Sequence, residues 1–221
     1  MGVVTYFVEP GSPFTAWLWY VGLMLAFIAV AGAGITGRTF GFLIDSRKKM
    51  SLSRFQIVLW TIVILPALLA VAMARVFGGI EHPLDIHIPQ QIWLVMGIST
   101  TSLIGSPLLL SQKTRVQRPA AFVAVPSTGL VAVNNNADDA NWSDLFTGEE
   151  VGNFAYLDMA KVQMFFFTLV LVAIYAVALG NLLYNNKDIQ NFPSLDSSMT
   201  ALLAISHSGY LVSKAVPHTP A

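Results

Sequence analysis

Five stretches of the chain contain no Lys, Arg, Asp or Glu, and this feature limits the possible folds more than any other. They cover Ala16–Thr36, Phe55–Ala74, Ile92–Leu110, Val162–Leu183 and Met199–Ser213. A helix that spans the hydrocarbon core of a bilayer needs about 20 predominantly apolar residues. The last stretch is shorter and more polar, but Lys214 is placed to extend it to the membrane interface. The sequence predicts an all-α, polytopic membrane protein with about five transmembrane helices.

The composition supports this class and excludes several others. Only 11% of the 221 residues are charged, against about 25% in soluble domains. The net charge is zero, which gives no reason to expect nucleic acid as a partner. Cysteine is absent, which excludes disulfides, thiolate metal sites and cysteine nucleophiles.

The basic residues predict the orientation, because cytoplasmic loops are enriched in Lys and Arg. Ten of the twelve fall on one side of the predicted helices: Arg38, Arg47, Lys48, Lys49, Arg54, Lys113, Arg115, Arg118, Lys161 and Lys214. The other side has only Arg75 and Lys187. We therefore expect an integral protein of the plasma or inner membrane, with the N-terminus outside and the C-terminus in the cytoplasm.

An internal repeat appears when the sequence is shifted by 107 residues. At this offset Gln56 falls on Gln163, and Ser99 falls on Ser206. The predicted architecture is one helix followed by two helix pairs in parallel, which should superpose by rotation about an axis near the membrane normal. The expected divisions are an N-terminal helix with a basic loop (1–50), a first helix pair (51–110), a cytoplasmic loop (111–157), and a second helix pair with a short tail (158–221).

The loop between the third and fourth predicted helices has two recognisable parts. Its first part alternates like two short strands around a turn at Pro126–Gly129. Its second part is acidic, and we expect a solvated loop, because its carboxylates lack the spacing of a calcium-binding EF-hand. The aromatic residues Trp142 and Phe146 stand in this polar segment, and they predict docking on the membrane surface or on another subunit.

Polar residues within the predicted spans are the remaining candidate sites. They are Gln56, Ser99, Thr100, Thr101, Ser102, Gln163, Ser206, His207 and Ser208. Small hydroxyl residues let helices approach closely and bond across them, and the glutamines suit an interhelical hydrogen bond. The same groups also suit the lining of an ion or solute path. His207 is an ionisable side chain inside a predicted span, which by default indicates a functional hypothesis.

No arrangement of nucleophile, base and acid is visible, and no cofactor or metal motif. Carboxylates, which proton-coupled carriers need, are absent from all five spans. The sequence therefore favours a subunit without catalytic activity, which acts as a scaffold or anchor beside other membrane subunits or copies of itself. The alternative is an ion channel or small-solute carrier, whose path would be lined by the hydroxyl clusters and His207.

Overall fold

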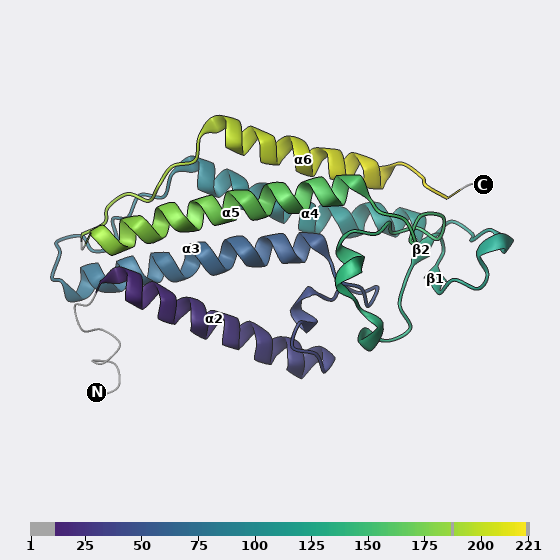
Figure 1. Ribbon diagram of the computed structural model, residues 1–221, viewed down its shortest axis with the longest axis horizontal. Helices are drawn as coiled ribbons and strands as arrows, with labels where there is room; N and C mark the ends of the chain where they lie inside the picture. The colour runs from purple at the N-terminus through teal and green to yellow at the C-terminus, as the bar shows by residue number, and fades with distance from the viewer. Residues whose placement is uncertain (1–11, 187, 220–221) are drawn as a thin grey trace.

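Five long helices dominate the structure, a computed structural model that describes residues 12–186 and 188–219 (Figure 1). They are α2 (Pro13–Thr36), α3 (Leu52–Phe77), α4 (Gln90–Lys113), α5 (Met159–Asn185) and α6 (Ser197–Ala215). Each contains one of the uncharged stretches, so the predicted positions of the five helices are confirmed. Helices α2 to α5 are long and apolar enough to cross a membrane, whereas α6 is shorter and more polar. The chain is thus a mostly helical, integral membrane protein.

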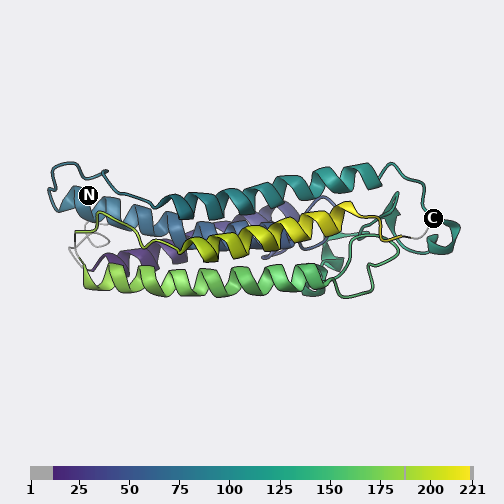
Figure 2. The same ribbon diagram turned by 90° about the horizontal axis from the view of Figure 1, so that it is seen from above.

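Four of the helices form a closed ring, in which α3 contacts α4, α4 contacts α6, α6 contacts α5, and α5 contacts α3. Figure 2 shows α4, α6 and α5 side by side in this ring. Helix α2 lies outside it, against α3 and α5. Successive helices run in opposite directions, so the starts of α3 and α5 and the ends of α2, α4 and α6 meet at one end of the molecule (Figure 1).

The helix ends follow local sequence signals. The side chain of Ser12 accepts a hydrogen bond from the Phe14 amide, and the carboxylate of Asp158 accepts from two amides in the first turn of α5. Helix α2 stops at Gly37, whose φ of 75° is a left-handed conformation that glycine adopts without strain. Helix α3 differs, because no side chain caps its first turn.

Two apolar cores lie along the bundle. The larger one fills the interior of the four-helix ring and the contact between this ring and α2. Within it, the side chains of Trp60 and Tyr175 pack with their aromatic centroids 5.9 Å apart. The smaller one lies at the end where the loops gather, and it joins Leu43 and Leu145 from loops to Met164 and Tyr210 from α5 and α6. The long loop is therefore packed onto the helices.

The loop between α4 and α5 is built from short elements. They are η2 (Ala120–Phe122), β1 (Ser127–Thr128), β2 (Val131–Ala132), η3 (Ala137–Asp139) and η4 (Trp142–Leu145), while η1 (Gly41–Leu43) precedes α3. A hairpin forms here, because β1 and β2 pair antiparallel, but β1 lies within the expected turn and part of the expected first strand forms η2 instead. The turn lies two residues later than expected, centred on Gly129, whose φ is 59°. A Cβ there would lie 2.3 Å from the Thr114 carbonyl oxygen, so only glycine fits.

The helix starts agree with the spacing of the sequence repeat. Helix α5 begins 107 residues after α3, and α6 begins 107 residues after α4. The two loops at the opposite end of the bundle also pair with each other, through a parallel bridge between His87 and Asn191. The rotational relation between the two helix pairs stays a prediction.

Candidate functional site: a buried carboxylate and a polar seam

Glu149 is the centre of a buried ion-pair network at the loop end of the bundle. Its Oε1 lies 3.1 Å from a guanidinium nitrogen of Arg47 and 3.2 Å from Nζ of Lys161. Its Oε2 lies 2.6 Å from Nζ of Lys214. These cations come from the loop before α3, from α5 and from α6, so a single carboxylate joins three separate parts of the chain.

The network fixes the charge of Glu149. Burial alone would raise the pKa of this carboxyl, but the positive charges of Arg47, Lys161 and Lys214 outweigh it and hold the pKa well below its usual value. Burial would likewise lower the pKa of Arg47, yet Glu149 and Asp45 hold it above the ordinary value. Both groups are therefore charged at neutral pH.

Glu150 fastens a second set of segments. It pairs with Lys113 at the end of α4, with Nζ and Oε1 2.5 Å apart. Its other oxygen accepts hydrogen bonds from the amides of His218 and Thr219, each 3.0 Å long. Burial opposes ionisation here too, but these partners lower the pKa of Glu150 below its ordinary value.

The expectation of a solvated acidic loop is therefore wrong for its C-terminal half. Asp138 and Asp139 are exposed, whereas Glu149 and Glu150 are buried and paired with cations. Arg47 and Lys214 lie far from Glu149 in the sequence, so the local charge pattern gives no sign of these two partners. The expectation holds only for the carboxylates of η3.

A polar seam runs between α4 and α6 from the middle of the bundle to this network. Its first contact is a 2.6 Å hydrogen bond between Ser102 Oγ and His207 Nδ1. One turn further, Ser106 and Tyr210 are 3.3 Å apart through their hydroxyls, and Lys214 donates to both. The seam joins His207, through neighbouring polar side chains, to the helix end that carries Glu149.

The other predicted polar residues divide into two groups. Gln56 is fully buried and donates to Thr168 Oγ1 at 2.7 Å, which links α3 to α5. Gln163, its partner in the repeat, is exposed, so the two glutamines differ in environment. Thr100 and Thr101 are also exposed, and each donates to a backbone carbonyl of its own helix.

Ser99 and Ser206 are buried, whereas Ser208 is exposed. Within residues 12–186 and 188–219, seven buried polar atoms of the helices have no hydrogen-bond partner: Ser53 Oγ, Gln56 Oε1, Trp60 Nε1, Ser99 Oγ, Tyr175 OH, Ser206 Oγ and His207 Nε2. Sequence reasoning missed Trp60 and Tyr175, because aromatic residues in an apolar span read as core. Buried polar atoms normally bond to protein or to ordered water, so these atoms mark the interior as partly polar.

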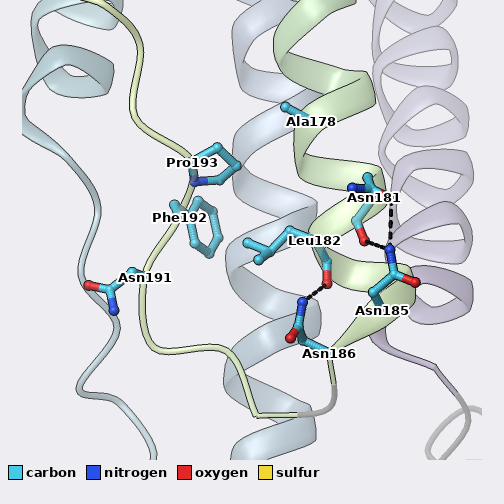
Figure 3. Close-up of a pocket in the computed structure, with 8 residues that line it drawn as sticks. All are labelled: Ala178, Asn181, Leu182, Asn185, Asn186, Asn191, Phe192 and Pro193. Carbon is cyan, nitrogen blue, oxygen red and sulfur yellow. Dashed lines mark hydrogen bonds between the residues drawn. The ribbon is translucent and has the colours of Figure 1, made fainter.

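The opposite end of the bundle carries an amide-lined groove of about 440 Å³ beside the end of α5 (Figure 3). The Asn185 amide donates to the Asn181 side chain at 2.7 Å, and the Asn186 amide donates to the Leu182 carbonyl at 3.0 Å. Two of the four asparagines around the groove therefore bond to the helix itself. These two asparagines therefore satisfy polar groups at the C-terminal end of α5.

The docking residues of the long loop have different surroundings. Trp142 is 45% exposed, and its ring meets Phe40 edge-on with centroids 5.2 Å apart. Phe40 is itself 46% exposed, so the two rings form an aromatic patch beside the end of α2. Phe146 instead packs inward against Phe165 of α5. Only Trp142 of the two is available for docking.

Within the described part of the chain, no cluster of three or more His, Asp or Glu residues is placed to hold a metal ion. Comparison with family models, with curated proteins and with solved structures finds no match to this chain. The case for a function therefore rests on the geometry of the chain itself.

Proposed function

We propose that this protein is a membrane anchor without catalytic activity, which holds a rigid loop platform at the cytoplasmic surface for another subunit or a second copy of the chain. The observation that carries the proposal is the Glu149 network. A solvated loop would not need a buried carboxylate with three cationic partners from separate elements. This amount of internal bonding suits a segment whose shape must stay fixed.

The polar residues of the interior support the same role. Ser102 and His207 bond to each other, and Gln56 bonds to Thr168, so these groups join helices. Two of the predicted path-lining residues, Thr100 and Thr101, are exposed. Packing through such contacts is the usual way in which polar residues hold membrane helices together.

The aromatic patch of Phe40 and Trp142 supplies a contact surface beside the membrane. We expect the full chain in a mild detergent to form an oligomer, or a complex with another subunit, whose mass light scattering will show. Trp142→Ser should shift this mass towards that of the monomer, because large aromatic side chains dominate contact energies. Tyr156→Ser is the matched control, since Tyr156 is 70% exposed on the same loop. If light scattering shows a monomeric wild-type protein without a stoichiometric partner, the proposal is wrong.

The orientation of this anchor is part of the proposal. Ser194 lies in the loop that joins α5 to α6, and Ser143 lies in η4 at the opposite end. Both are exposed, and the chain contains no cysteine. In intact cells an impermeant thiol reagent should label Ser194→Cys and leave Ser143→Cys unlabelled. The reverse pattern would invert the topology.

A channel or small-solute carrier is the second candidate, and the unbonded interior atoms favour it. His207 Nε2, Ser99 Oγ and Ser206 Oγ are among these atoms, and all three belong to α4 and α6. Hydrated, they would line a path along the polar seam. Under the anchor proposal, liposomes that contain the protein should show the same flux of small ions at about pH 5.5 and 7.5, values that bracket the ordinary imidazole pKa. A pH-dependent flux that His207→Ala abolishes would establish the second candidate instead.

A further inference from the structure

A groove of about 530 Å³ opens between α3 and α4 in the half of the bundle near the loops. Residues of both helices, of the loop before α3 and of β2 line it, among them Arg47, Arg54, Val58, Leu103 and Pro107. The charged and hydroxyl side chains gather mostly at the helix ends, and the apolar ones lie further into the helices. The groove therefore changes from polar to apolar along the direction in which the helices cross the membrane.

Arg54 is the one cation of this groove that forms no ion pair within the described residues. Its guanidinium has a single, long hydrogen bond of 3.4 Å to the Phe42 carbonyl. Arg47 is neutralised by ion pairs with Asp45 and Glu149. Asp45 is the only carboxylate in the groove lining, and it is bound to Arg47 rather than to Arg54. Lys161, which matches Arg54 in the repeat, is buried against Glu149. Among the residues that the structure describes, the positive charge of Arg54 thus has no carboxylate partner.

The start of α3 adds to this positive potential. Ser51 lines the groove, but its side chain does not cap the first turn, whereas Asp158 caps α5 at the matching position. The first-turn amides of this 26-residue helix therefore have no side-chain acceptor, and Ser51 and Arg54 place the start of the helix beside the polar end of the groove. Such amides and the helix dipole favour a negative group.

The apolar half continues from Arg54 towards the middle of the bundle. Ile57 and Val58 follow one turn further along α3, opposite Leu103 and Pro107 of α4. Ile57, Val58 and Leu103 are half-buried, and Pro107 is exposed. These side chains form an apolar half of the groove that is open towards the lipid phase.

We propose that this groove binds one anionic phospholipid of the leaflet on the loop side, with its phosphate on Arg54 and the start of α3. An acyl chain then lies along Val58 and Leu103. The unpaired charge selects an anionic headgroup, and the apolar continuation distinguishes a lipid from a small soluble anion. Each basic residue at a membrane surface strengthens the binding of anionic lipid about fivefold.

The test is native mass spectrometry of the full chain in mild detergent with added phosphatidylglycerol or phosphatidylcholine. The wild-type protein should retain phosphatidylglycerol in preference to phosphatidylcholine. Arg54→Gln should weaken the retention of phosphatidylglycerol about fivefold, and Arg54→Lys should preserve most of it. Arg115→Gln is the matched control, because Arg115 is exposed directly beyond Thr114 of the groove lining.

Two further arms test the lipid chain. Val58→Phe, which fills the apolar half, should also reduce retention, whereas Val170→Phe on the exposed face of α5 should leave it unchanged. Circular dichroism of each variant checks that the helices are intact. Equal retention by the wild type and Arg54→Gln, or by the wild type and Val58→Phe, would overturn the proposal. Displacement of the lipid by millimolar inorganic phosphate would show that the groove binds small anions, and would overturn the assignment to a lipid.

Discussion

Glu149→Gln is expected to lower the free energy of unfolding by about 3–5 kcal/mol at neutral pH, because removal of one partner leaves a buried charge uncompensated. Three cations lose their shared counter-charge in this variant: Arg47, Lys161 and Lys214. Equilibrium unfolding of the full chain in detergent would measure the loss. Asp138→Asn, an exposed carboxylate on the same loop, should change the stability by less than about 0.5 kcal/mol.

The effect of Glu149→Gln should depend on pH in a defined direction. The pKa of Glu149 is depressed in the folded protein, so its contribution is complete above the unfolded value of about 4.3 and disappears as the pH falls through the folded pKa. The difference between wild type and variant should therefore not shrink between about pH 7 and 5, and should shrink only in stronger acid. A difference that already shrinks between pH 7 and 5 would contradict the assigned network.

Arg75→Gln is expected to have the second-largest effect, about 2–3 kcal/mol, through loss of the contacts that fasten the loops at the opposite end of the bundle. Arg75 is 3% exposed, and its guanidinium donates to the carbonyls of His82, Pro83 and Ile189. It also pairs with Asp188 at 2.7 Å. The variant leaves these acceptors without their shared donor, which hydrogen exchange in both loops would detect.

The matched control removes the other half of the same ion pair. The side chain of Asp188 is 48% exposed, so water screens its interaction with Arg75. Asp188→Asn should therefore cost less than about 1 kcal/mol and leave the three carbonyl contacts in place. Equal losses in the two variants would show that the ion pair, and not the carbonyl contacts, holds the loops.

Much of the fold was predictable because it depends on local sequence. The uncharged stretches place all five helices, and the loop pattern predicts a hairpin, although it places the turn two residues too early. The repeat offset also agrees with the helix starts. Gln56 was expected to bond between helices, and its hydrogen bond to Thr168 has that form.

The candidate site was less predictable, because Glu149 pairs with Arg47 and Lys214, which lie far from it in the sequence. Glu149 reads as one acidic residue of a polar loop, and Lys214 reads as an interfacial anchor, until the fold brings them together. Likewise, the repeat pairs Gln56 with Gln163, yet only Gln56 faces the interior, since the two helices present different sides to the ring. Sequence periodicity does not resolve which side of a nearly uniformly apolar helix is buried.

The order of synthesis gives the Glu149 network a further consequence. Arg47, Glu149 and Lys161 leave the ribosome before α6, and Lys214 follows near the end of that helix. Until α6 has joined α4 and α5, the carboxylate lacks one of its three cations, and the seam residues of α4 lack Tyr210 and His207. The platform therefore reaches its final shape only after the last helix is in place, so a nascent chain that stalls before α6 would present an open, incompletely paired surface to its partners.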